Sequence, residues 1–226
     1  VTALIIFTKE LSPMAETSNS TKQHIIHAAK KLFSQNSYGA VSTRKIASDA
    51  RIGQSGIFFY FPSKEDLATA VIDDILKYHR LYYDPIDEKI NAALESGCLT
   101  PEGALELLRE FINIQFDIAF NPANQYALSF SLSDRGMPDE VIRPLRDDVK
   151  NSIELPMARL LCVAKNSSNL SAAYTLCHVI NKAICGCLSS PVLTDTAMEF
   201  GTFKGEQDIQ TTVKNFINTA ILHAEI

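Results

Sequence analysis

Apolar residues recur at helical spacing along most of this chain. From about residue 20 they return every three or four positions, as in Ile25, Ala29, Leu32 and Phe33. That period places them on one face of an α-helix. The sequence has no convincing run in which apolar and polar residues alternate, as they do in a half-buried strand. The pattern therefore predicts an all-α fold.

The first helices are predicted from their starting residues. Ser20 and Gln23 have the spacing of a capping box, which would start a first helix near residue 20. Gly39 would end that unit. A second helix would begin at Ser42 or Thr43, because both residue types are favoured N-caps.

A tight turn and a short third helix follow. The turn is predicted at 51–53 and the helix at about 54–60, with Ile57 and Phe61 as core contacts. Ser63 and Asp66 then have the spacing that opens a long fourth helix. The fold class expected for this segment is a three-helix unit joined by a long helix to the rest of the chain.

Beyond the fourth helix the pattern predicts helices only. Their expected spans are 85–96, 102–120, 122–133, 138–164, 169–189 and 206–224. Pro85 would stand at the start of one helix. Pro144 and Pro156 fall inside another, so that segment is expected to be kinked or split.

Charge is distributed unevenly along the chain. Between Thr21 and Lys64 seven residues are basic and only Asp49 is acidic, which gives this segment a net charge of +6 with its histidines neutral. The whole chain carries −5, so the remainder sums to −11. A basic helical unit on an acidic body indicates one part that contacts a polyanion and another that does not.

The cysteines and the first residues indicate the cellular compartment in which the protein is expected. The five cysteines show no regular framework, which is typical of a reducing environment. Cys185 and Cys187 form a C-x-C pair and are expected to be small buried side chains. The apolar residues 1–7 are too few to span a bilayer, which takes about 20, and they lack the basic region of a signal peptide. We therefore expect a cytoplasmic protein in which residues 1–19 are a flexible or extension segment. Met14 is a candidate natural start.

The second and third predicted helices form a helix-turn-helix arrangement, whose second helix enters the DNA major groove. The start of that helix is small and polar, and reads Gly53, Gln54, Ser55, Gly56. A glutamine amide can pair with the N6/N7 edge of adenine. Thr43 and Lys64 stand near predicted helix N-termini, where free amides attract phosphate.

The order of these residues resembles the N-terminal domain of the TetR family of transcriptional repressors. The resemblance is carried by Ala29-x-x-Leu32-Phe33, Tyr38-Gly39, Thr43-x-x-Ile46-Ala47 and Ile57-Phe58-Phe59-Tyr60-Phe61-x-Ser63-Lys64-Glu65-x-Leu67. It implies a homodimer with a DNA-binding domain over 20–64. The remainder, 65–226, would serve dimerisation and would bind a small effector that releases the protein from a palindromic double-stranded DNA operator.

The resemblance also implies roles for single residues. The positions that match backbone contacts are Thr43, Tyr60 and Lys64, and those that match base readers are Arg44, Gln54 and Ser55. Three positions depart from the family pattern. Phe58 stands where Tyr is usual and lacks its hydroxyl, and Gly53 stands where Ser is usual. Arg51 replaces the usual turn Gly, which predicts a positive φ.

The last two predicted helices carry nearly continuous apolar faces. The resemblance implies that each pairs with its mate in a four-helix bundle of a dimer, since such exposed surface is a liability on a monomer. The alternative is that both are internal core helices. A pocket for an apolar or amphipathic effector is predicted from Phe111, Gln115, Phe116, Tyr126, Phe130, Tyr174 and His178. Each of these side chains could instead belong to the core.

Features of an enzyme or a cofactor site are not evident in the sequence. The five histidines are scattered, and no Gly-rich phosphate loop occurs. His24 and His27 could share a helix face, but a third metal ligand is lacking nearby. We therefore expect a DNA-binding regulator without catalysis, cofactor or metal. The alternative is a helical interaction protein that kept the fold and lost DNA binding, which the missing hydroxyl at Phe58 favours.

Overall fold

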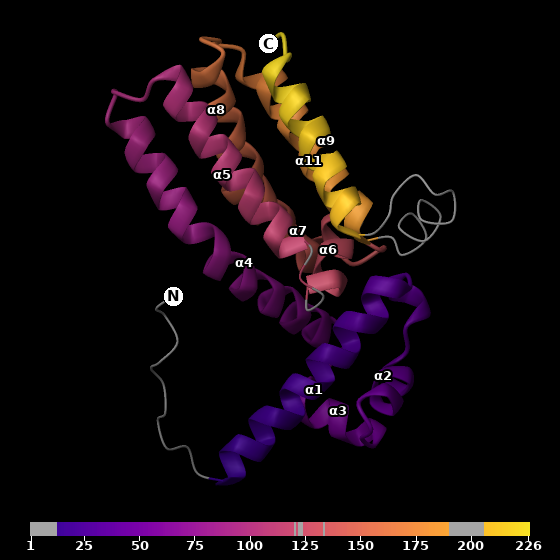
Figure 1. Ribbon diagram of the computed structural model, residues 1–226. Coiled ribbons are helices and arrows are strands. Elements are labelled where there is room, and N and C mark those ends of the chain that lie inside the picture. Colours follow the sequence, from indigo (N-terminus) through magenta and orange to yellow (C-terminus); the bar gives the residue numbers. More distant parts are fainter. Residues whose placement is uncertain (1–12, 120, 122–123, 133, 190–205) are drawn as a thin grey trace.

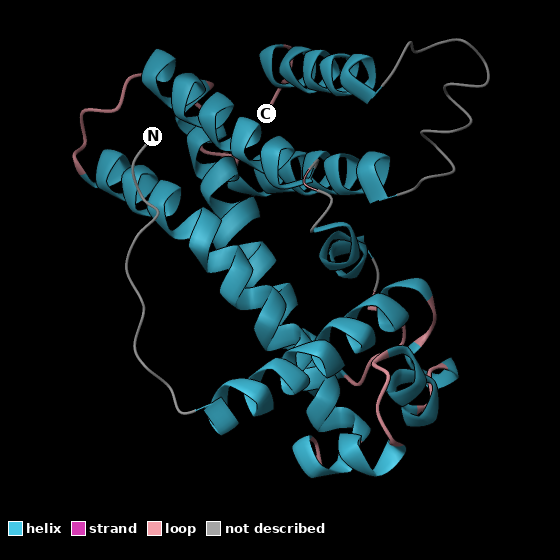
Figure 2. Ribbon diagram, turned by 60° about the horizontal axis from the view of Figure 1, so that its bottom comes forward, coloured by secondary structure: helices cyan, strands magenta, loops and turns pink. Residues whose placement is uncertain are grey.

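The computed structural model describes residues 13–119, 121, 124–132, 134–189 and 206–226 (Figure 1). Within these ranges the regular structure is helical and no strand occurs (Figure 2), which confirms the predicted all-α class. The elements are α1 (Pro13–Gln35), η1 (Tyr38–Ala40), α2 (Thr43–Asp49), α3 (Gln54–Tyr60), α4 (Lys64–Glu95), α5 (Pro101–Ala119), α6 (Gln125–Leu132), α7 (Asp139–Asp148), the π-helix η3 (Val149–Glu154), α8 (Leu155–Ala164), α9 (Leu170–Ser189) and α11 (Glu206–Leu222).

Helix α1 begins earlier than the sequence pattern predicted. It starts at Pro13, a residue favoured in the first turn because its missing N–H would have no intrahelical partner there. Ser20 therefore lies inside the helix, and the predicted capping box of Ser20 and Gln23 is wrong. The remainder of the predicted N-terminal extension, residues 1–12, lies outside the described residues.

Helix α4 starts as predicted and ends later. The Ser63 hydroxyl accepts from the Asp66 amide over 3.0 Å, and the Asp66 carboxylate accepts from the Ser63 amide over 2.9 Å, which completes a capping box. The helix then continues through Pro85 to Glu95, so the predicted break at Pro85 is wrong. Pro85 and Leu81, one turn before it, are exposed, and the carbonyl that the proline leaves without a partner can bond to water.

The segment predicted as one kinked or split helix over 138–164 is helical without a gap from Asp139 to Ala164, and it consists of α7, η3 and α8 in succession. Pro144 is exposed inside α7, and Pro156 stands in the first turn of α8, where proline is tolerated. The irregularity lies between the two prolines, in the π-helix η3, whose i→i+5 hydrogen bonds accommodate an extra residue per turn.

The packing joins the N-terminal helices to the rest of the chain. Helix α1 packs against α4 and α6, α4 against α7, and α8 against α5 and α9. Figure 1 shows α1, α2 and α3 at one end and α4 running from them to the far end of the body. One continuous set of buried apolar residues extends through both parts, from Ile25 and Ile57 to Phe111 and Leu161. Across the described residues, no helix is both long and apolar enough to cross a membrane.

Candidate nucleic-acid interface and ligand pocket

The turn between α2 and α3 is a Schellman motif. The Arg51 amide donates to the Ser48 carbonyl over 3.2 Å, and the Ile52 amide donates to the Ala47 carbonyl over 3.0 Å. Arg51 has a φ of 57°, which confirms the predicted positive value. This conformation costs a residue with a Cβ about 1 kcal/mol relative to glycine. An exposed arginine is thereby fixed beside the start of α3.

The start of α3 presents exposed polar groups. Gln54 and Ser55 are exposed, and the Gln54 amide donates to the Thr43 hydroxyl over 3.3 Å, which links the starts of α3 and α2. A Cβ added at Gly56 would meet Ile52 at 3.5 Å, an ordinary contact, and Gly53 has an ordinary φ of −70°. The fold itself therefore does not require glycine at either position.

Helix α2 begins after one of its two predicted N-caps. Ser42 is the N-cap, and its side chain accepts from the Lys45 amide over 3.2 Å. Thr43, the other candidate cap, is the first helical residue and is half-buried. Arg44 and Lys45 follow it in α2 and are both exposed.

Lys64 has a partner inside the protein. Its ammonium donates to the Tyr38 carbonyl over 2.5 Å and lies 4.0 Å from the centroid of the Tyr38 ring. Burial lowers the pKa of Lys64 from its ordinary value, and burial together with the charge of Glu65 raises the pKa of Tyr38. The lysine thus joins the start of α4 to η1, and its contact with phosphate stays a prediction.

The end of α3 carries exposed aromatic rings. Phe59 is 80% exposed and Phe58 45% exposed, whereas Tyr60 is half-buried with its ring edge-on to Phe59 at 5.0 Å. Phe58 stood out in the sequence only for its missing hydroxyl, so this apolar surface beside the candidate DNA contacts was not predicted.

Two of the seven basic residues between Thr21 and Lys64 form ion pairs with acidic residues. Lys30 forms an ion pair with Asp74 of α4, and Lys31 lies 3.3 Å from Asp49 of α2. These pairs hold α1 to its neighbours. The exposed cations in α2 and in the turn before α3 are Arg44, Lys45 and Arg51.

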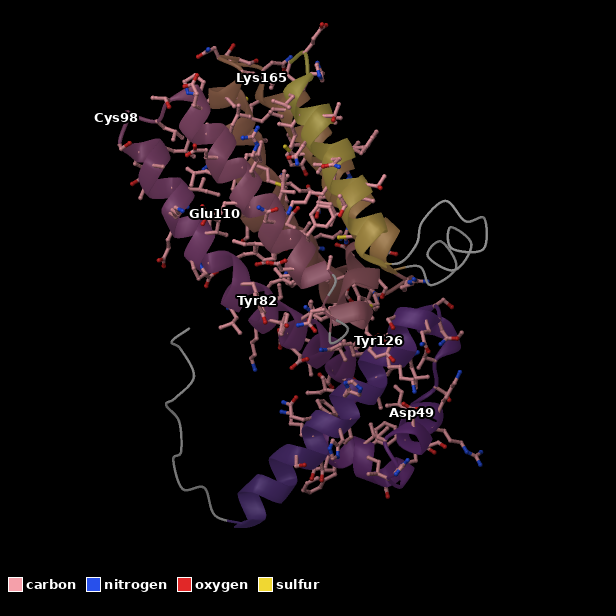
Figure 3. All side chains as sticks on the ribbon, in the orientation of Figure 1. Asp49, Tyr82, Cys98, Glu110, Tyr126 and Lys165 are labelled. Atoms are coloured by element: carbon pink, nitrogen blue, oxygen red, sulfur yellow. The ribbon has the colours of Figure 1, made fainter. Side chains whose placement is uncertain are left out.

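A pocket of about 470 Å³ lies between α6, α7, η3 and α9. Three of the seven predicted pocket residues line it, namely Phe130, Tyr174 and His178. The other four are Phe111, Gln115, Phe116 and Tyr126, and the structure places them elsewhere. The first three are buried in the core on α5. Tyr126 instead faces α1, with its ring 6.1 Å from that of His27 (Figure 3).

A buried carboxylate stands at the end of η3. Glu154 is 2% exposed and lines the pocket. Its Oε2 accepts from the Tyr174 hydroxyl over 2.7 Å, and its Oε1 accepts from His178 Nδ1 over 2.8 Å and from Asn181 Nδ2 over 3.2 Å. Burial and the bond to Glu154 raise the pKa of Tyr174 to about 12, so the phenol stays protonated and donates.

Glu154 was not among the pocket residues predicted from the sequence. The available signal was a single acid between apolar neighbours, Ile153 and Leu155, followed by two hydrogen-bonding aromatic residues four positions apart on one helix. Because π-helices are frequent at functional sites, the position of Glu154 at the end of η3 strengthens its candidacy.

The described thiols and histidines show no metal site. Among the described residues, no group of three His, Cys, Asp or Glu side chains could hold a metal ion. Cys185 is buried, as predicted, and so is Cys177, and burial raises the pKa of each thiol to about 12. Cys98 is exposed and Cys162 half-buried, and the side chain of Cys187, the other member of the predicted pair, lies outside the described part of the chain.

The helix-turn-helix over α2 and α3, carried by α1 and α4, is the DNA-binding arrangement of bacterial transcriptional regulators. Residues 25–71 match the family described as bacterial regulatory proteins, tetR family. The match falls on the N-terminal segment that carried the resemblance to the TetR family.

A relative is similar to this chain over a short length. The uncharacterized HTH-type transcriptional regulator YuxN of Bacillus subtilis (strain 168) is 40% identical over 60 residues, which are 26% of this chain and 18% of that protein. The matched segment thus spans less than a fifth of that relative's length.

Solved structures resemble the whole described fold. The MbdR regulator from Azoarcus sp. CIB has a TM-score of 0.60 at 20% identity over 91% of this chain and 99% of that one. The fatty acid degradation regulator FadR from Bacillus halodurans has a TM-score of 0.54 at 17% identity over 96% and 98%. At these identities the likeness shows a shared fold.

Proposed function

We propose that this protein is a transcriptional regulator, and specifically a repressor that leaves its operator when a small effector binds the C-terminal domain. In this proposal residues 20–64 bind DNA and residues 65–226 bind the effector and form the dimer. The observation that carries the proposal is the exposed start of α3, where Gln54 and Ser55 lie among exposed basic side chains of an otherwise acidic chain.

The DNA-binding residues divide into two groups in this proposal. Arg44, Gln54 and Ser55 contact base edges, because guanidinium, amide and hydroxyl groups match the hydrogen-bonding groups of the major groove. Thr43, Tyr60 and Lys64 contact the phosphate backbone. Arg51 and Lys45 add to this charge, since both are exposed beside the same surface.

The proposed dimer forms through α9 and α11. Phe216 of α11 is 69% exposed and Val179 of α9 is 57% exposed. In the part of α11 whose side chains are described, Ile217 and Ile221 are the buried residues. A second copy that covers the exposed face would remove this apolar surface from water and would place two reading helices against a palindromic operator.

Two contacts provide a route from the pocket to the DNA-binding helices. The Tyr38 amide donates to the Arg135 carbonyl over 2.8 Å, and His79 of α4 lies 3.0 Å from Asp148 of α7. The neighbours Asp134 and Val149 line the pocket. A ligand that moves this wall would therefore alter both contacts, and a coupling of about 1–3 kcal/mol would change operator affinity roughly 5- to 150-fold.

The experiment that tests this function is selection of duplexes from random-sequence DNA, followed by footprinting on the selected sequence. We expect a protected site with two-fold symmetry and half-sites about 10 base pairs apart or a multiple of that spacing. Recovery of no preferred duplex would contradict the proposal. It would favour the alternative, an interaction protein that uses the exposed Phe58 and Phe59 against another protein.

A further inference from the structure

We propose that the effector carries a hydrogen-bond donor, an amine or a hydroxyl, on an apolar body, and that Glu154 is the residue that selects it. This inference rests on the proposed function, because it concerns the ligand of the same C-terminal pocket. It follows from the separation of apolar and polar groups on the pocket lining.

The apolar part of the lining is aliphatic and aromatic. Phe130, Ile142, Leu145 and Val149 line the pocket, and each is less than a tenth exposed. Such a surface favours a hydrocarbon portion of a ligand, which leaves water on binding. The volume of about 470 Å³ is within the range of small-molecule sites.

The deeply buried polar group on this lining is an acceptor. The Glu154 carboxylate offers about four acceptor positions, and Tyr174, His178 and Asn181 occupy three of them. A ligand hydroxyl or amine can donate to the remaining position. A ligand whose only polar atom accepts would gain no bond there, and an anion would be repelled by a charge in a medium of low dielectric constant.

The cations on the lining do not reverse this preference. Arg146 and Lys150 are exposed, so water and salt screen their charges. Arg146 also forms an ion pair with Asp139. Asp134 and Asp147 lie on the same lining and offset the remaining positive charge, which includes that of Lys182. The interaction best shielded from water is the one with Glu154.

The neighbours of Glu154 hold the carboxylate in place. Tyr174 and His178 are one turn apart on α9, and their rings stack with centroids 6.2 Å apart and an interplanar angle of 26°. Because a carboxylate can only accept, His178 Nδ1 carries the hydrogen in its bond to Glu154. The acceptor is therefore fixed in position before a ligand arrives, which lowers the entropy lost on binding.

The test uses four probes of similar size: octylamine, 1-octanol, methyl octyl ether and octanoate. Isothermal titration calorimetry on the unaltered protein should show the amine and the alcohol binding at least roughly tenfold tighter than the ether and the carboxylate, as expected for a hydrogen bond to a charged group. Equal binding of all four, tighter binding of octanoate, or no binding by any of them would overturn the proposal.

A substitution assigns the preference to the residue. Glu154→Gln should remove the advantage of octylamine over octanoate, whereas Glu140→Gln, at an exposed acid of α7 outside the pocket lining, should retain it. Loss of the preference in both variants would overturn the assignment to Glu154. If Glu154→Gln does not fold, the ranking on the unaltered protein still decides the ligand class.

These binding measurements use no DNA, so their failure is separate from failure of the proposed function. The same probes added to the complex with a selected duplex then test release. An amine that binds the pocket and leaves duplex affinity unchanged would support the ligand class and contradict effector control.

Discussion

Asp148 at the end of α7 lies 3.0 Å from His79 in α4, measured between Oδ2 and Nδ1. Both side chains are nearly buried, with 14% and 9% of their surfaces exposed. The pair joins the helix that leads to the DNA-binding unit to the residue immediately before η3. Any change in the π-helix that displaces Asp148 must therefore strain or break a contact of α4.

Asp148→Ala should lower the free energy of unfolding by about 1–3 kcal/mol, because it leaves a buried nitrogen of His79 without its partner. Urea unfolding followed by circular dichroism measures this change. Asp147→Ala removes an exposed acid at the adjacent position and is the matched control, with an expected effect within about 0.5 kcal/mol. Equal destabilisation by the two substitutions would show that the pair does not tie α7 to α4.

Arg51→Gly should raise the free energy of unfolding by about 1 kcal/mol, since glycine adopts the positive φ of this turn without the cost that Cβ imposes. It should also weaken DNA binding by removing an exposed cation. Arg51→Ala separates the two effects, because alanine retains the strain and loses the charge. A glycine variant that is less stable than the parent would contradict the interpretation of the turn.

Cys98 should react with iodoacetamide at pH 8 in the folded protein, while Cys177 and Cys185 should not. Burial raises the pKa of each of the latter thiols to about 12, which leaves a thiolate fraction of roughly one in ten thousand at that pH. Mass spectrometry of the alkylated peptides gives the result for each site. Labelling in urea should reach every cysteine and serves as the positive control.

Phe216→Ser should shift the protein from dimer to monomer in analytical ultracentrifugation, because it removes the largest exposed apolar side chain of α11 from the proposed interface. Leu81→Ser is the control: Leu81 is also 69% exposed, but it lies on α4. A dimer that persists at low micromolar concentration in the Phe216 variant, or equal dissociation of both variants, would place the interface elsewhere.

Local structural features could be predicted from the sequence. The capping box of Ser63 and Asp66 is legible because its partners are three residues apart, and α3 begins and ends where its turn residues indicated. The positive φ of Arg51 was predicted because the resemblance places glycine at that position, and the Schellman turn imposes this φ on the residue that follows the cap. These features depend on neighbours along the chain.

Features that depend on distant neighbours were not predictable from the same pattern. Lys64 donates to the carbonyl of Tyr38, and Glu154 accepts hydrogen bonds from side chains of α9. The partners of Lys64 and of Glu154 lie far away in the sequence and could not be inferred from residue spacing. Apolar residues on a helix look alike whether they face a core or a cavity, which is why Phe111 was predicted for the pocket and lies in the core. The π-helix could not be predicted either, because the prolines at 144 and 156 indicate an irregular helix but do not indicate which kind of irregularity lies between them.

The central claim is that the start of α3 and the cations around it bind duplex DNA. The most direct test is the affinity for a selected duplex as a function of salt concentration, compared between Arg44→Ala and Arg80→Ala, a substitution of an exposed arginine on α4. We predict a steep fall of affinity with salt for the parent, weaker binding by Arg44→Ala with a slope reduced by about one or less, and parental behaviour for Arg80→Ala. An affinity that does not change with salt concentration, or that falls equally in both variants, would contradict DNA binding by this surface.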